Sequence, residues 1–186
     1  MVRLINSLCL ALVLAACGDN SARYLIDTPA PAARIPVRVS TIEVLDAKLP
    51  AYASALEVPV QSEGGALQNL GGAIWGDDPV RAVTVALSRS LEETTTAKVA
   101  AEPWPLSTPA QAVLDLRVER MLARTDGQFE LSGQYAIASP DGAVRERLER
   151  FDILVPLPSS DAAGISTAAG RAIAKLGEQI ARTLAR

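Results

Sequence analysis

The side chains that could carry out chemistry in this 186-residue chain are of few kinds. Histidine is absent, so the usual general base near neutral pH and the commonest metal ligand are both missing. The two cysteines, Cys9 and Cys17, are too few for the zinc sites that Cys and His build. The sequence contains neither a phosphate-binding loop nor a G-x-S-x-G nucleophile elbow. We therefore expect no enzyme activity, no metal site and no cofactor.

Two pairs of adjacent carboxylates remain as candidates for acid–base chemistry. Asp77 and Asp78 come directly before Pro79, where an aspartate can cap a helix and a proline can occupy its first turn. Glu92 and Glu93 lie near the end of the same expected helix. A helix cap and a solvated helix face explain these pairs more simply than catalysis does.

Cys17 is the residue whose position indicates a covalent modification. Arg3 precedes an apolar run that ends at Leu14, and two alanines separate that run from Cys17. A spanning helix needs about 20 apolar residues, so this shorter run is typical of a cleaved secretory signal. The Leu-Ala-Ala-Cys ending resembles the bacterial lipobox, which implies cleavage before Cys17 and attachment of lipid to it. An ordinary signal peptide is the alternative, and it would leave a free thiol in an oxidising compartment.

The residues after Cys17 bear on where the protein is anchored. In enteric bacteria an aspartate directly after the lipidated cysteine retains lipoproteins in the inner membrane. Here Gly18 holds that place and Asp19 follows it. The resemblance therefore implies anchoring at the periplasmic face of the outer membrane. The covalent lipid on Cys17 would hold firmly, since each buried CH₂ contributes about 0.8 kcal/mol.

The remaining chain is long enough for one domain. We expect residues 1–16 to be the lipoprotein signal peptide, residues 17–23 a lipidated tether and residues 24–186 a single periplasmic domain. The whole chain has a formal net charge of −3 and no basic cluster, which argues against a nucleic-acid partner.

The first half of the domain should hold short strands and one helix. Strands are expected at residues 24–27, 37–45 and 56–61, and Pro59 places the last at a sheet edge. The helix should begin at Pro79 and end in the threonine run 94–96, because β-branched residues disfavour helix. Its buried stripe would be Val80, Val83, Leu87 and Leu91.

The second half alternates strongly between apolar and polar residues. This pattern predicts three strands over residues 112–123, 128–139 and 143–157. Asp126-Gly127 and Asp141-Gly142 fall between them and favour tight hairpin turns. A last amphipathic helix should follow a cap at Ser159 or Ser160. Its small residues would permit close approach to a sheet or to another helix, and self-association stays open as a minor alternative.

Together these elements predict an α+β fold. We expect a mixed, mostly antiparallel sheet with two amphipathic helices packed on one face.

The order of these features resembles the ABC-type transport auxiliary lipoprotein family, the PqiC-like lipoproteins associated with MCE lipid transporters. A lipobox cysteine is followed by the "YLI" strand at residues 24–26. A strand then leads to a Leu-Pro-x-Tyr pattern at Leu49, Pro50 and Tyr52. Another strand leads to Trp75, and an acidic residue and proline open the helix. The similarity covers almost the whole mature chain.

The resemblance implies an accessory subunit that meets an MCE-domain protein and takes part in intermembrane lipid traffic. Leu49, Pro50, Tyr52 and Trp75 are the implied candidates for partner binding. Tyr52 and Trp75 could equally pack the domain's own core. The family often has an Asp-Arg pair soon after the tyrosine, whereas this chain has alanine and serine at residues 53–55.

Two other functions stay open at this point. The protein could carry lipid itself in a greasy groove between sheet and helices. It could also be an accessory lipoprotein for outer-membrane assembly, with a β-barrel partner.

Overall fold

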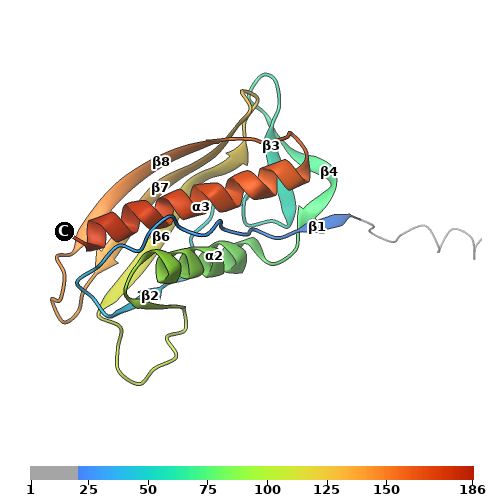
Figure 1. The fold of residues 1–186 in the computed structure, drawn as a ribbon. Helices are drawn as coiled ribbons and strands as arrows, with labels where there is room; N and C mark the ends of the chain where they lie inside the picture. Colours follow the sequence, from blue (N-terminus) through green and yellow to red (C-terminus); the bar gives the residue numbers. More distant parts are fainter. Residues whose placement is uncertain (1–20) are drawn as a thin grey trace, which may run out of the picture.

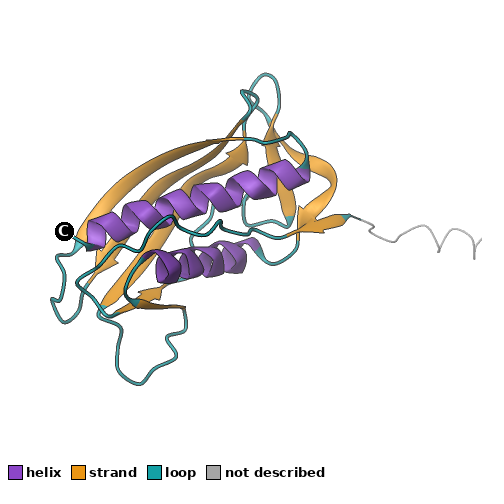
Figure 2. Ribbon diagram, in the orientation of Figure 1, coloured by secondary structure: helices purple, strands orange, loops and turns teal. Residues whose placement is uncertain are grey.

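The computed structural model describes residues 21–186 as a sheet with two helices against one of its faces (Figure 1; Figure 2). The helices are α2 (Pro79–Thr94) and α3 (Ala162–Leu184). Within this part of the chain, neither helix is long and apolar enough to cross a membrane. The eight strands are β1 (Ala22–Tyr24), β2 (Thr41–Val44), β3 (Glu57–Gln61), β4 (Leu67–Trp75), β5 (Lys98–Ala101), β6 (Ala112–Ala123), β7 (Gln128–Ala138) and β8 (Arg147–Pro156).

The long strand β6 forms the middle of the sheet, and both of its edges are paired. One edge pairs antiparallel with β7, which pairs antiparallel with β8, and each pairing extends over ten residue pairs. Two strands share the other edge of β6. β2 pairs parallel with the beginning of β6, and β3 pairs parallel with its end through Val60 and Ala123. β5 lies beyond β2, while β4 and then β1 lie beyond β3. The sheet is therefore mixed, and its longest pairings are antiparallel.

Helix α2 begins and ends as its sequence predicts. Asp78 caps it, since its Oδ1 accepts a hydrogen bond from the Arg81 backbone N–H at 3.0 Å. At the other end the Thr95 N–H donates to the Leu91 carbonyl, and the following chain is extended.

Helix α3 is capped by Asp161, so the prediction of a cap at Ser159 or Ser160 is wrong. The Asp161 carboxylate accepts the Gly164 N–H at 2.8 Å and the Ser159 hydroxyl at 2.7 Å. A carboxylate suits the positive end of a helix better than a neutral hydroxyl does. Ser159 therefore holds the cap in place without being the cap.

The core lies between the helices and the sheet. Both helices pack on each other, with α3 over β7 and β8 and α2 over β2 and β5. Gly177 lets them approach closely, because a Cβ there would lie 2.4 Å from the Ser90 hydroxyl oxygen. The small residues of α3 are buried inside the domain, so they are not a surface for self-association. The predicted α+β fold, with two helices on one face, is confirmed.

One detail of the sheet differs from expectation. Pro59 does not mark an edge, because β3 lies between β4 and β6. A proline is tolerated there since the β3–β4 register shifts between Glu57 and Pro59, and β6 meets β3 only at Val60. The long free edge of the sheet is β8 instead.

Candidate functional site

The segment that carries the Leu-Pro-x-Tyr pattern lies along β6, between β2 and β3. Lys48 anchors it, because its N–H donates to the Leu116 carbonyl and its carbonyl accepts from the Val118 N–H, at 2.9 and 2.8 Å. The chain then turns at Pro50, whose carbonyl accepts the Ala53 N–H. This segment, residues 45–56, is hereafter called the β2–β3 connection. It fills the part of the β6 edge that β2 and β3 leave unpaired.

Tyr52 holds the β2–β3 connection to the sheet. Its hydroxyl oxygen accepts a hydrogen bond from the Met121 backbone N–H of β6 at 3.1 Å. Leu49, Pro50 and Tyr52 are half-buried, and Leu49 and Tyr52 pack on the core. Within the described residues Tyr52 therefore has a structural role, and a contact with a partner remains a prediction.

Trp75, the last residue of β4, is 1% exposed. Its backbone N–H donates to the Leu56 carbonyl at 2.7 Å, which joins it to the end of the β2–β3 connection. Its indole nitrogen is buried and has no hydrogen-bond partner among residues 21–186. Trp75 cannot touch a partner while the domain stays folded this way, so its packing role is the one that the geometry supports.

The carboxylate pairs make ordinary structural contacts, and Cys17 lies outside the described part of the chain. Asp77 pairs with Arg81, and Asp78 caps α2. The backbone carbonyls of Glu92 and Glu93 accept hydrogen bonds from Arg34. Cys17 lies outside the described residues, so its lipidation stays a prediction. No group of three metal-ligating side chains is found in residues 21–186.

The strand register on the outer face of the sheet brings charges of both signs together. Asp115 binds both Lys48 and Arg117, at 2.7 and 2.9 Å. The hydrogen bond from Arg117, aided by Lys48, holds the pKa of Asp115 below its usual value. Further along, the buried Glu130 binds both Arg120 and Arg124 at 2.9 and 3.1 Å. The arginines of this face are therefore neutralised by carboxylates.

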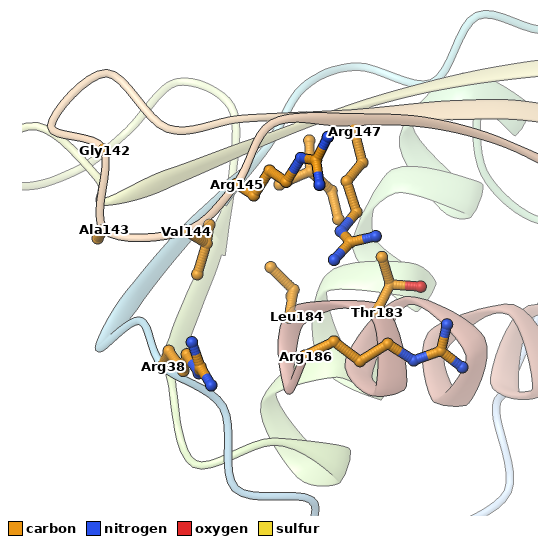
Figure 3. Close-up of a pocket in the computed structure, with 10 residues that line it drawn as sticks. Arg38, Gly142, Ala143, Val144, Arg145, Arg147, Thr183, Leu184 and Arg186 are labelled. Carbon is orange, nitrogen blue, oxygen red and sulfur yellow. The ribbon is translucent and has the colours of Figure 1, made fainter.

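A different arrangement occurs at the end of the sheet where α3 finishes. A pocket of about 240 Å³ is lined by four arginines, hereafter called the arginine pocket: Arg38, Arg145, Arg147 and Arg186. Figure 3 shows Arg145 and Arg147 reaching into it from the chain that enters β8, Arg38 on the opposite side below Val144, and Arg186 extending from the end of α3 beneath Thr183. No carboxylate side chain lines this pocket.

Tyr135 borders a neighbouring cavity with Thr183, Arg186 and the carboxylate residue Glu149, which forms no ion pair with Arg186. Its hydroxyl lies 2.9 Å from the Thr183 hydroxyl, and burial raises the pKa of the tyrosine above its usual value. The phenol therefore stays neutral at physiological pH and does not offset the charge of the four arginines.

The arginine pocket is not apparent from the sequence. Arg38 and Arg186 are separated by nearly the whole domain, and no local pattern links them. The one available signal is the pair Arg145 and Arg147 beside a hairpin turn, which sequence reasoning treats as the polar phase of a strand.

The profile of the family described as "ABC-type transport auxiliary lipoprotein component" matches residues 24–181. The chain belongs to this family. The resemblance inferred from the lipobox, the Leu-Pro-x-Tyr pattern and Trp75 is thereby confirmed. Members of this family are membrane-anchored auxiliary components of transport systems, and the family is not an enzyme family.

Two solved structures share the fold of this auxiliary lipoprotein. A crystal structure of an uncharacterized protein is 14% identical, with a TM-score of 0.71, and the alignment covers 88% of this chain and 98% of the other. Protein XCC0632 from Xanthomonas campestris, assigned to the DUF330 family, is 20% identical, with a TM-score of 0.67 and coverage of 88% and 95%. At these identities the likeness shows the fold alone. No curated protein matches the sequence.

Proposed function

We propose that this auxiliary lipoprotein is anchored in the outer membrane and serves as the periplasmic accessory subunit of an MCE-type lipid transport system. The observation that carries the proposal is the family match over residues 24–181, which begins shortly after a lipobox-like sequence that ends at Cys17. Gly18 in place of an aspartate supports the outer membrane. A tethered domain meets its partner at a raised effective concentration, so a weak contact suffices.

The exposed part of the β2–β3 connection is the surface that we assign to the MCE-domain partner. Ala51 is exposed between the half-buried Pro50 and Tyr52, which fix the turn on which it sits. Leu56, near the end of the connection, is 43% exposed. Trp75 supports this surface from within, through its hydrogen bond to the Leu56 carbonyl.

The accessory role is favoured over a lipid-carrying role by the packing of the helices. Leu87, Leu91, Leu176 and Ile180 are each 0% exposed where the helices meet the sheet. A lipid between sheet and helices would have to displace these side chains. The carrier therefore requires the helices to separate from the sheet, whereas an accessory subunit uses the domain as it is.

The test is the identity of the proteins that accompany the full-length chain out of the membrane. Tagged protein is purified in mild detergent and its partners are identified by mass spectrometry, with Cys17→Ala as the variant that lacks the anchor. We expect an MCE-domain protein or its permease with the wild type and much less with the variant. Recovery of a β-barrel protein without any MCE-domain protein would contradict the proposal and favour outer-membrane assembly.

The partner surface is tested by a charged substitution at the exposed turn. Ala51→Glu should reduce recovery of the partner about tenfold or more, since it places a charge in the proposed contact. Ala66→Glu, an exposed alanine in the turn between β3 and β4, is the matched control. Equal recovery with both variants would remove the β2–β3 connection from the interface.

A further inference from the structure

The arginine pocket brings together side chains from three distant parts of the chain. Arg38 precedes β2, Arg145 and Arg147 lie at the entrance to β8, and Arg186 follows α3. None of the four forms an ion pair or a side-chain hydrogen bond with another described residue. The feature that sets them apart is this shared location, because single unpaired arginines are ordinary on a protein surface.

Four cations around one small space repel each other unless an anion lies between them. A cleft lined by charges of one sign concentrates the electric field and attracts counter-ions. The contrast with the outer face of the sheet is direct, since Arg117, Arg120 and Arg124 there all have carboxylate partners. The arginine pocket lacks an internal counterpart of that kind among its lining side chains.

The chemistry of the guanidinium group favours a phosphate. Its planar fork of donors binds the oxygens of phosphate in pairs, and such charge-assisted hydrogen bonds are about twice as strong as neutral ones. Thr183 also lines the space, but its hydroxyl already donates to the Gln179 carbonyl at 3.1 Å, so the arginines are the donors for a ligand. Figure 3 shows Arg145 and Arg147 above the space and Arg38 below it, while the Arg186 side chain extends along α3 beneath Thr183. Guanidinium groups on two sides of the space suit a tetrahedral anion.

The size and the remaining lining limit the ligand further. The pocket holds about 240 Å³, which is smaller than the space that a drug-sized ligand needs. Ile137, Val144 and Leu184 add apolar surface beside the arginines. The space therefore suits a phosphate with a short carbon group attached, such as a lipid headgroup, and excludes a whole lipid.

The loop that carries Arg145 is held in place by its own hydrogen bonds. The Asp141 carboxylate accepts the Ala143 N–H at 3.0 Å, and the Ser139 hydroxyl oxygen accepts the Val144 N–H at 3.2 Å. The Ser139 hydroxyl also lies 2.9 Å from the Gln111 carbonyl, next to β6. Arg145 is thus presented on a pre-formed loop, which lowers the entropic cost of binding.

A structural explanation competes with ligand binding. Cations near the last turn of a helix are stabilising, because the helix C-terminus carries partial negative charge. This accounts for Arg186 at the end of α3, but Arg38 and Arg145 belong to other segments. The two explanations predict opposite results. Removing an arginine that stabilises the helix end should make the protein less stable, whereas removing one that repels its neighbours should make the protein more stable.

We propose that the arginine pocket is a binding site for a phosphate group, either that of a phospholipid headgroup or free phosphate. The proposal does not rest on the transport function. If the protein binds phosphate but purifies without an MCE-domain partner, the phosphate site is supported and the proposed transport function is contradicted.

The test uses the full-length lipoprotein in a non-ionic detergent, at constant ionic strength adjusted with NaCl. Inorganic phosphate and glycerophosphoethanolamine are the probes, with glycerol as the phosphate-free control. Isothermal titration calorimetry measures the affinity. The melting temperature should rise by about 5–10 °C when the concentration of the probe exceeds its Kd about a hundredfold. Glycerol should produce no shift.

Arg38→Gln/Arg145→Gln should weaken binding tenfold or more. Both side chains are exposed, so the variant should fold, and without ligand its melting temperature should equal or exceed that of the wild type. Arg171→Gln, which removes an exposed arginine of α3 outside the pocket, is the matched control and should bind as the wild type does. Arg147→Gln is the second test variant.

Two results would overturn the proposal. One is the absence of any phosphate-dependent shift, and the other is equal binding by the wild type and the Arg38→Gln/Arg145→Gln variant. If glycerophosphoethanolamine binds tenfold more tightly than inorganic phosphate, the site is one for a lipid headgroup. Equal or tighter binding of inorganic phosphate assigns the same site to the free ion.

Discussion

At the scale of single residues, Tyr52 is the candidate whose role can be measured most directly. Tyr52→Phe keeps the ring and removes the oxygen that accepts the Met121 N–H. Leaving this N–H without a partner should lower the free energy of unfolding by about 1–3 kcal/mol. Urea unfolding of the full-length protein in detergent measures the change.

The same variant separates the structural role of Tyr52 from partner binding. If Tyr52 acts through the fold, the variant should still recover the partner at temperatures where it is folded. Loss of the partner with no loss of stability would show instead that the hydroxyl itself contacts the partner.

Gly170 is a residue at which a small change should have a large effect. A Cβ at this position would lie 1.9 Å from the Asp27 carbonyl oxygen, which belongs to the backbone and cannot rotate away. Glycine to alanine within a helix normally stabilises it by up to about 1 kcal/mol. Gly170→Ala should reverse that sign and destabilise by about 1–3 kcal/mol.

Arg171→Ala, at the next and exposed position, is the control for Gly170→Ala and should change stability by less than about 0.5 kcal/mol. Chemical denaturation at equilibrium measures both. A stabilising Gly170→Ala would mean that the chain near Asp27 does not lie against α3.

Asp115 gives the domain a dependence on acid pH. Because Arg117 and Lys48 lower its pKa, the ionised form stabilises the folded state. This contribution is complete above the pKa of an unfolded aspartate, about 3.9, and is lost as the pH falls through the lower folded value. Since the partners are exposed, it should amount to about 1 kcal/mol or less.

The measurement for Asp115 is urea unfolding of the wild type and Asp115→Asn between pH 7 and pH 2.5. The wild type should be the more stable at pH 7, and the two should converge at the acid end. A difference that does not change with pH would show that the carboxylate charge is not the cause.

At the scale of the elements, α3 protects the free edge of the sheet. Lys175 and Gln179 reach from α3 to the backbone carbonyls of Leu154 and Arg150 on β8, at 3.4 Å each. β8 also exposes Leu148 and Leu154, by 67% and 43%. A long edge strand with exposed leucines is prone to pair with another chain unless it is covered.

Lys175→Ala/Gln179→Ala should therefore increase self-association. Size-exclusion chromatography with light scattering, in detergent and at several protein concentrations, measures the mass. Arg171→Ala, on the same helix but without these contacts, should behave as the wild type does. An unchanged mass for the double variant would show that the two side chains do not guard the edge.

The elements that the sequence predicted well are those with long, regular patterns. The alternation of β6 and β7 extends over ten or more residues in each strand, and Asp126-Gly127 forms the tight turn expected between them. In α2, Val83, Leu87 and Leu91 of the predicted stripe are buried, but Val80 is only half-buried. The prediction of a second tight hairpin turn at Asp141-Gly142 is wrong, because β7 ends at Ala138 and β8 begins only at Arg147. β5 has four residues and no alternation that stands out, so its pairing with β2 could not be seen. The position of Pro59 in an internal strand depends on a register shift with β4, which only the assembled sheet reveals.

At the scale of the whole molecule, the candidate sites separate along α3. The described chain begins at the N-terminal end of that helix, where Ser166 bonds to the Leu25 carbonyl, and the arginine pocket lies at its C-terminal end. The helical rise places Thr183 about 25 Å beyond Ser166. The sequence indicated the anchor and the fold, but this separation arises from the way β1 joins β4.

The attachment of β1 has a mechanical consequence. A lipid anchor ahead of β1 and a partner bound to the rest of the domain would stretch the chain between them, and the load enters at Ala22. β1 holds by three residue pairs to β4, and the next firm point is Ile35, whose N–H donates to the Thr94 carbonyl. Between them, Ile26 is the buried apolar residue.

Pulling on the N-terminus should therefore peel off the first segment before the core yields. Single-molecule force spectroscopy should record an early extension, followed by rupture of the remaining domain. The early extension should be at most about 4 nm, the contour length of the chain before Ile35, because the segment already spans part of that length in the fold. Ser166→Ala should lower the force of the first event and leave the second unchanged. Rupture in a single step would mean that the first segment and the core unfold together. If the first segment detaches separately, it acts as an extensible link that lengthens under tension while the rest of the domain keeps its shape.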